Sequence, residues 1–427
     1  MFQGISLDQA PPFSVPVRFF LTAPLFLMLS GVLMLLGDPS ALESRWSYPS
    51  LALVHALTVG FGGMVMLGAL TQMLPVLAGV KLRSPLKLAR IVHSALSFGT
   101  LAMIFGFWFS SVPLLFLALG LLGAGFGLFL FGLGYELFFR VAFVNSTIKA
   151  MRYAVVALVL VVLSGGIMLG LHALGISVPW QMEMIQFHLK AGSFGWTFLL
   201  ILGVSFQVIP MFYVTQEYPL WLREKGVKLF VGVLLLSLGM PWFLGGDEGW
   251  LLDILAILAI LWSAFTLKNL ASRKRALADT TIRYWQISSL SLILFGLLFL
   301  LSPYLSWDSS SWLFLLFAYG FGVSLINGML YKIIPFLVWF HLSGAGVFMI
   351  PSMREMIEEK RMLLQLFLHL LAGIALGAGM AQSLFFYPAG LLLLLSNGLL
   401  GYNLYKASQI YYANLPKGAD SNGMEKD

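Results

Sequence analysis

Long apolar stretches, separated by short polar connections, follow one another along the chain. We delimit twelve of them, at residues 18–37, 47–75, 91–110, 112–138, 151–174, 183–214, 226–245, 249–268, 284–305, 311–342, 362–380 and 383–407. Each has about 20 residues or more, the length that an α-helix needs to cross the hydrocarbon core of a bilayer. The alternating ten-residue segments of a transmembrane barrel are not seen. The pattern therefore predicts an all-α, polytopic membrane protein with twelve transmembrane helices.

Three of these spans share a pattern of glycine, aromatic, polar and proline positions. The repeated segments are GALTQMLP (68–75), GVSFQVIP (203–210) and GMLYKIIP (328–335). Fifteen residues before each proline stands another glycine, at 60, 195 and 320, followed by an aromatic residue. The copies lie in spans 2, 6 and 10, so the sequence predicts three four-helix pseudo-repeats. In each repeat the glycine-marked inner helix is expected to end at its proline.

These repeats suggest how the single membrane domain (1–410) is divided. We expect units at about 1–80, 81–215 and 216–345, with 346–410 forming the last two helices, and a disordered cytoplasmic tail at 413–427. The glycines are explained by close helix packing. The polar position, Gln72, Gln207 or Lys332, has two interpretations. Its side chain could bond carbonyls that the proline leaves free, or it could form part of a transport site.

Charge then orients the spans. The chain has 25 Lys and Arg, and all except Arg45, Lys190 and Lys332 lie in the even-numbered connections or near the termini. The odd-numbered connections are acidic. Because Lys and Arg stay on the cytoplasmic side, both termini are expected there, in a bacterial inner membrane. The net charge of +7 reflects this asymmetry, and gives no indication of nucleic-acid binding. The chain has no cysteine, which excludes disulfides and thiolate metal sites.

The architecture also resembles a known superfamily. Twelve helices in three units, with helices 2, 6 and 10 innermost, resemble subunit I of the haem–copper oxidases. The segment HALTVGFGGMVMLGALTQMLPVLAG (55–79) is similar to the second helix of the NnrS-like membrane proteins. Those proteins bind haem and copper and are linked to the response to nitric oxide. The resemblance implies haem b or copper as the cofactor. It places a haem ligand at His55 and, as a partial match, a copper ligand at His188.

The sequence departs from the oxidases at other positions. The oxidases need adjacent histidines in helix 7, and span 7 has none. They also need two histidines in the outer half of helix 10, where span 10 has only His341, at its cytoplasmic end. A binuclear oxygen-reducing centre cannot be assembled without them. We therefore expect no oxygen reductase activity, and no enzyme activity is assigned.

The six histidines differ in their expected depth. His55, His188 and His369 lie inside spans, where an ionisable group is a functional candidate, and we take all three as cofactor-binding and the first two as metal-binding. The other three, His93, His172 and His341, lie near span ends and are expected to be solvated or capping. His55 stands 20 residues before Pro75 and His188 22 before Pro210, about 200° apart on a helix. A single metal bound by both His55 and His188 is therefore not favoured. Two separate pockets, one at each histidine, fit the sequence as well.

Two lysines fall within spans, and the function has more than one interpretation. Lys190 and Lys332 could snorkel to the interface, or could contact an anion, a haem propionate or a proton path. One hypothesis is an NnrS-like protein that binds haem or copper. The alternatives are a cofactor-free transporter or channel-like protein, built around the polar repeat positions and Lys190, and a structural subunit of a membrane complex. The expected partners are lipid and other membrane or electron-transfer subunits.

Overall fold

The computed structural model describes residues 10–42, 44–80, 82–141, 143–243, 248–274 and 279–416. Within these ranges twelve helical segments are long and apolar enough to cross a membrane, which confirms the predicted fold class. Their boundaries differ from the expected ones by seven residues at most. The largest difference is in the last span, whose helix continues to Asn414 and so includes the first two residues of the expected tail. Residues 417–427 of that tail lie outside the described ranges.

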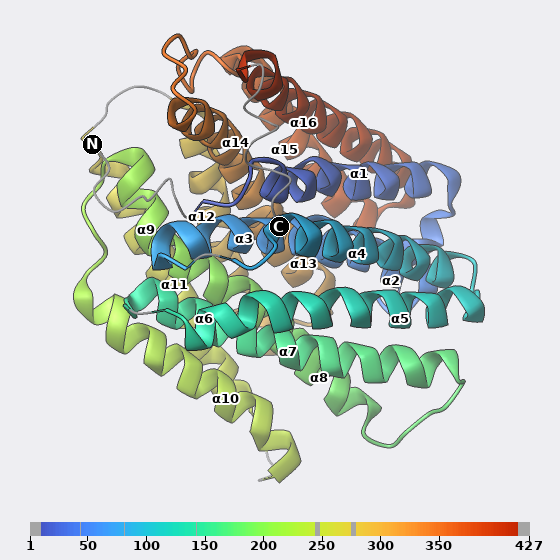
Figure 1. Cartoon of the computed structure of the whole chain (residues 1–427). Coiled ribbons are helices and arrows are strands. Elements are labelled where there is room, and N and C mark those ends of the chain that lie inside the picture. The colour runs from blue at the N-terminus through green and yellow to red at the C-terminus, as the bar shows by residue number, and fades with distance from the viewer. Residues whose placement is uncertain are drawn as a thin grey trace.

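Several spans consist of more than one helical segment (Figure 1). In chain order they are α1 (Ser14–Leu36); α2 (Tyr48–His55), η3 (Ala56–Gly63) and α3 (Met64–Ala78); α4 (Pro85–Trp108); α5 (Val112–Phe129), η4 (Leu130–Gly134) and α6 (Tyr135–Phe139); α7 (Ser146–Ala173); α8 (Gln181–Lys190), η5 (Ala191–Phe198) and α9 (Leu199–Tyr213); η6 (Leu222–Gly226) and α10 (Val227–Phe243); α11 (Gly249–Ala271); α12 (Thr280–Leu301) with the turn η7 (Ser302–Tyr304); α13 (Ser310–Phe314), η8 (Leu315–Val323) and α14 (Ser324–Gly344); α15 (Glu359–Ala381); and the turn η9 (Ser383–Phe385) with α16 (Phe386–Asn414). A further short turn, η2 (Pro39–Leu42), follows α1.

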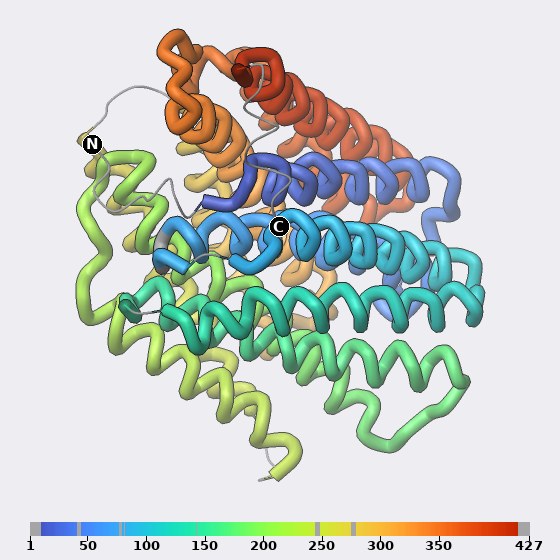
Figure 2. Tube along the Cα trace, in the orientation of Figure 1, coloured from blue at the N-terminus to red at the C-terminus, as the bar shows by residue number. Residues whose placement is uncertain are grey.

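The first and last helices of the bundle lie side by side. Figure 2 shows α1 in blue along α16 in red, and the two helices pack against each other. Within the bundle, α1 packs on η3 and α3, α7 on η5 and α9, and α12 on η8 and α14. We therefore group the spans into a first unit (14–139), a second unit (146–271) and a third unit (280–414), in place of the boundaries expected from sequence. The end where α1, α7 and α12 begin is called the basic end.

The repeated glycines meet the first helix of their own unit at a constant spacing. In every pair, a Cβ built on the glycine would lie 2.4–2.8 Å from a side-chain atom of its partner, too close for any larger residue. The pairs are Gly60 with Phe26, Gly195 with Ala157, Gly320 with Ser291, Gly68 with Phe19, Gly203 with Ala150 and Gly328 with Tyr284. The partners in each first helix are seven residues apart, so the three helix pairs pack in the same register.

Each inner span also contains a π-helical segment at the same place. The segments η3, η5 and η8 begin 19, 19 and 20 residues before Pro75, Pro210 and Pro335, and each includes the first repeated glycine. A π-helix has a wider turn, is rare, and is frequent at functional sites. The sequence pattern did not predict these π-helical segments, because the spans were delimited by hydrophobicity alone, which does not distinguish a π-helix from an α-helix.

The prediction that the prolines terminate the inner helices is wrong, whereas the span ends predicted at residues 214 and 342 lie within two residues of the observed ends. The helix continues for three residues after Pro75 and Pro210, and for nine after Pro335. A proline removes only its own N–H bond to the carbonyl four residues earlier, and tertiary packing can hold the helix across that gap. Beyond Pro335, the side chains of Phe336, Leu337 and Val338 are buried. That packing supports the last turns of α14.

Candidate functional site

His55, the last residue of α2, has one ring nitrogen held by the backbone. Its Nδ1 lies 2.7 Å from the carbonyl oxygen of Leu51. Because a carbonyl only accepts, Nδ1 carries the proton and donates it, which leaves the lone pair on Nε2. The imidazole also stacks on the ring of Phe107 from α4, with centroids 5.8 Å apart. His55 is thus oriented in the way typical of an imidazole ligand.

His188 of α8 is held in a similar way, by a side chain of α7. Its Nδ1 lies 3.1 Å from the Oγ of Ser164. The Ser164 hydroxyl donates to the Leu160 carbonyl at 2.7 Å, so its oxygen accepts from Nδ1 of His188. The absence of a side chain at Gly165 makes room for the ring, because a Cβ there would lie 2.8 Å from the His188 Cε1. Its Nε2 lone pair is therefore also available.

The two imidazoles lie on α2 and α8, the first helical segments of spans 2 and 6. Both face the end of the bundle opposite the basic end. Relative to the repeat they face about 200° apart. Because spans 2 and 6 stand at different places around the bundle, opposite helix faces can still point into one region. We call His55 and His188 the histidine pair.

The donor set of this pair limits what it could hold. Among the described residues, no group of three or more His, Cys, Asp or Glu could hold a metal ion. The protein would thus supply two imidazoles at most. Imidazole suits haem iron and copper, whereas structural zinc requires four protein ligands.

His369 of α15 belongs to a different place, inside the third unit. Its Nε2 lies 2.8 Å from the Oγ of Ser324, and its ring stacks on Tyr319 with centroids 4.5 Å apart. The Tyr319 hydroxyl donates to the His369 carbonyl at 2.9 Å. The Nδ1 atom is buried and has no hydrogen-bond partner among the described residues. The structure therefore separates His369 from the histidine pair with which the sequence grouped it.

His369 is one member of a set of buried polar side chains that we call the third-unit polar cluster. Its members are Tyr284, Tyr319, Ser324, Tyr331, Gln365, His369, Ser396, Asn397 and Asn403. Tyr284 donates to Gln365, which donates to Ser396 at 3.0 Å. Asn403 donates to Tyr331 at 3.1 Å. These residues come from all four spans of the unit. They extend from near the basic end, where α15 begins at Glu359, to His369, which lies about 15 Å farther along α15.

Three atoms of this cluster lack partners within the described part of the chain. They are Nδ1 of His369, Oδ1 of Asn397 and Oδ1 of Asn403. An unpaired polar atom inside a membrane protein costs several kcal/mol, about the penalty of transferring it to hydrocarbon. Buried water is the usual way to satisfy such groups. The cluster thus offers three buried polar atoms to which water could bind.

The three polar repeat positions have three different surroundings. The Gln72 amide is buried and finds no partner among the described residues, so it does not bond a carbonyl freed by Pro75. Gln207 is half-buried and lines a cavity. Lys332 forms an ion pair with Asp279 and lies over the ring of Tyr213, 5.4 Å from its centroid. Only the third position therefore carries an internal salt bridge.

Asp279 is the N-cap of α12 and accepts several hydrogen bonds. Its Oδ1 lies 2.9 Å from the N–H of Thr281 and 2.7 Å from the Thr281 hydroxyl. Burial opposes its ionisation, but Lys332 and the Thr281 donors outweigh burial and hold the pKa of Asp279 below its ordinary value. The carboxylate is thus charged at neutral pH.

Lys190 is also paired, at the opposite end of the bundle. Its Nζ lies 2.7 and 2.6 Å from the two carboxylate oxygens of Glu248, and 2.8 Å from the carbonyl of Ser237. The side chain is 7 % exposed. An ammonium has three N–H donors, and these contacts use them all. Lys190 therefore has no donor left for a haem propionate or another anion.

The remaining histidines, expected to be solvated or capping, are all partly exposed, and each also contacts a residue outside its own span. The Nε2 of His93 lies 2.8 Å from the Thr22 hydroxyl. The Nε2 of His341 is buried, and its ring meets the edge of Phe13. His172 packs against Phe107, the ring on which His55 stacks. This packing partner comes from another span, so the residue types around His172 do not reveal it.

The interior between the second and third units is filled by aromatic rings. They come from η5, α10, α11 and η8, and neighbouring centroids are 4.9–6.3 Å apart. The rings are those of Phe194, Phe198, Phe230, Trp262, Phe317 and Phe321. Such offset and edge-on contacts stabilise a packed core.

No protein-family model matches the chain, and no curated protein matches its sequence.

Proposed function

We propose that the protein is an integral membrane relative of the haem–copper oxidases and NnrS-like proteins, which binds haem or copper through the histidine pair. The observation that carries this proposal is that His55 and His188 each have Nδ1 held by a hydrogen bond, which leaves the lone pair on Nε2. The distribution of Lys and Arg supports a bacterial inner membrane with both termini in the cytoplasm. In that orientation the histidine pair lies in the outer half of the membrane.

The protein's own residues would position and tune the bound group. The Leu51 carbonyl and the Ser164 hydroxyl fix the tautomer of each imidazole, so that Nε2 presents its lone pair. Phe107 limits rotation of the His55 ring and excludes water from one face of it. A bound haem or copper would supply one-electron chemistry. We propose a role in sensing, electron transfer or cofactor handling.

Oxygen reduction is not part of this proposal. Span 7 contributes Phe230 to the aromatic interior and carries no histidine. Span 10 contributes Phe317 and Phe321 to the same interior. These rings supply no metal ligands where the oxidases need imidazoles. The protein therefore has no side chains for a binuclear centre.

The test is an absorption spectrum with elemental analysis on protein purified after expression with ample haem and copper. We expect a Soret band or about one copper per chain. The variants His55→Ala and His188→Ala should each abolish it, because one imidazole is then lost. His93→Gln, at the basic end, is the control and should bind normally. A wild-type protein with neither a Soret band nor copper would rule the proposal out.

A second candidate function is a transporter or channel-like activity without a cofactor, and the third-unit polar cluster favours it. A chain of buried polar groups in a membrane protein often marks an ion or solute path. We would measure proton flux into liposomes that contain the purified protein. His369→Leu and Gln365→Leu should lower the flux, whereas Gln72→Leu, in another unit, should not. Flux equal to that of empty liposomes would exclude this candidate for protons.

A further inference from the structure

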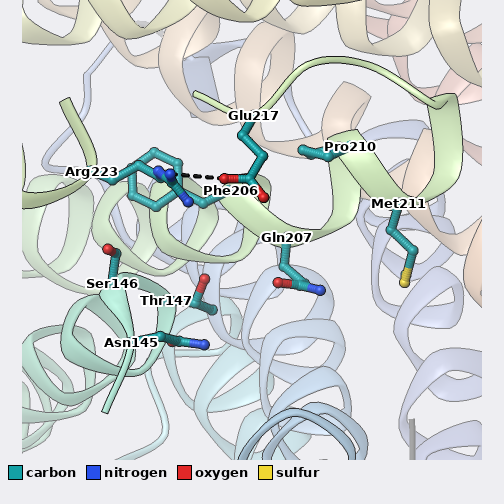
Figure 3. Close-up of a pocket in the computed structure, with 9 residues that line it drawn as sticks. All are labelled: Asn145, Ser146, Thr147, Phe206, Gln207, Pro210, Met211, Glu217 and Arg223. Carbon is teal, nitrogen blue, oxygen red and sulfur yellow. Dashed lines mark ion pairs between the residues drawn. The ribbon is translucent and has the colours of Figure 1, made fainter. Parts of the chain in front are cut away.

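A cavity of about 280 Å³ opens in the second unit, toward its basic end (Figure 3). It lies where α7 begins, α9 ends and η6 starts, apart from the histidine pair and from the third-unit polar cluster. Its lining residues are Asn145, Ser146, Thr147, Phe206, Gln207, Pro210, Met211, Glu217 and Arg223. The volume is about nine times that of a water molecule in the liquid, enough for a small polar group and some water.

The cavity occupies the place that an ion pair fills in the third unit. Gln207 follows Gly203 by four residues, as Lys332 follows Gly328. Likewise Asn145 stands five residues before the Gly203 contact residue of α7, and Asp279 five before the Gly328 contact residue of α12. Both are N-caps of their helices. The neutral side chains Asn145 and Gln207 thus replace the ion pair and leave space between them.

The unused groups in this space include several hydrogen-bond donors. The Oδ1 of Asn145 already accepts from the N–H of Ile148 at 2.9 Å, which leaves its amide NH₂. Arg223 donates from Nη2 to Glu217 at 2.8 Å, while its Nε is buried and without a partner among the described residues. Gln207 adds a second amide. Such donors suit a ligand that offers several acceptor oxygens.

The nearby carboxylates are engaged in other contacts. Glu217 is at the rim, with its side chain 69 % exposed, and it orients the Arg223 guanidinium. Glu224 accepts from Ser146 at 2.6 Å and pairs with Lys149 at 2.8 Å. Glu224 is thus neutralised by Lys149, whereas Glu217 would share the guanidinium of Arg223 with an anion bound here.

We propose that this cavity binds a phosphate group, held by Arg223 and the amides of Asn145 and Gln207. Arginine is well suited to phosphate because its planar fork donates in a fixed geometry. The phosphate could belong to free inorganic phosphate or to a phospholipid headgroup. Phe206, Pro210 and Met211 provide an apolar wall that a lipid would also use. The proposal does not depend on the histidine pair.

The test uses full-length protein that has been delipidated in detergent. One arm measures binding of ³²P-labelled inorganic phosphate, and the other measures retention of dihexanoyl phosphatidylglycerol by native mass spectrometry. We expect saturable, one-site binding in at least one arm, and the arm that responds identifies the source of the phosphate. Failure of both arms would overturn the proposal, even if haem or copper is found at the histidine pair.

The decisive variant is Asn145→Asp. Aspartate keeps the helix cap and nearly the same shape, but it adds a negative charge to the cavity. We expect at least tenfold weaker binding, and the same loss for Arg223→Gln. The control Arg354→Gln removes an exposed charge from the connection between α14 and α15 that does not line the cavity, and should bind like the wild type. The proposal is wrong if Asn145→Asp, shown to be folded by gel filtration, binds as well as that control.

Discussion

The ammonium of Lys332 forms an ion pair with the carboxylate of Asp279, at the two positions where the second unit has Gln207 and Asn145. The third copy of the repeat therefore departs from the others at both members of a pair. A buried lysine without this carboxylate would carry an uncompensated charge in a poorly hydrated place. Relative to the second unit, the two charges are thus best understood as a single coupled substitution. They stand at the N-cap of α12 and on α14, two helices that pack together through Gly328 as α7 and α9 do through Gly203.

Breaking this ion pair should cost more than replacing it. Lys332→Gln leaves Asp279 charged, with its side chain only 10 % exposed, and we expect a loss of about 3 kcal/mol of stability. The double variant Asp279→Asn/Lys332→Gln reproduces the neutral pair of the second unit and should recover most of that loss. Thermal unfolding in detergent, followed by tryptophan fluorescence, gives the values for a double-mutant cycle. Additive effects of the two single changes would contradict the pairing.

The same ion pair predicts a dependence of stability on pH. The pKa of Asp279 is lowered in the folded protein, so its contribution is complete above the unfolded value of about 3.9. It is lost as pH falls through the lower, folded value. Between pH 6 and pH 3 the unfolding temperature of the wild type should therefore fall more than that of Asp279→Asn/Lys332→Gln. Parallel curves for the two proteins would show that Asp279 does not contribute.

The repeated glycines should tolerate substitution far less than glycines that face open space. A Cβ at Gly203 would lie 2.4 Å from the Cβ of Ala150, so Gly203→Ala must push α9 away from α7. Overpacking of this kind costs about 1–3 kcal/mol. At Gly232 of α10, nothing lies within 4 Å of the added atom, and Gly232→Ala should be neutral or slightly stabilising. Equal unfolding temperatures for the two variants would refute the close contact.

The spans and the inner helices could be predicted from sequence because they depend on local properties. A run of about 20 apolar residues needs a helix whatever its neighbours are, and glycines at a fixed spacing indicate close packing. The π-helical segments could not be predicted in this way. Their wider turn changes no residue type in the pattern, as the ordinary apolar and glycine residues of η3 show. The extension of α14 beyond Pro335 depends likewise on packing by other helices.

The candidate sites were predictable only as far as single residues. Depth alone pointed to His55, His188 and His369, but which of them lie together depends on helix positions around the bundle. Asp279 carries no signal of its own, because an aspartate before a helix is an ordinary cap. Its role follows from Lys332, which lies 53 residues later. Similarly, the cavity beside Gln207 arises from two neutral residues, which no charge pattern marks.

The contact between His369 and Ser324 offers a test of the third-unit polar cluster. His369→Leu leaves the Ser324 hydroxyl only its long contact with the Tyr319 carbonyl, at 3.4 Å, and Ser324→Ala leaves a second ring nitrogen of His369 unpaired. Each single variant should lose about 1–3 kcal/mol, the cost of one unsatisfied buried polar group. The double variant removes both groups, so its loss should be clearly smaller than the sum. Because Leu fills the place of the ring only in part, some loss from packing is expected to remain. Thermal unfolding of the four proteins measures the coupling. If the two losses simply add, the contact contributes nothing, and His369 must instead be satisfied by water within the cluster.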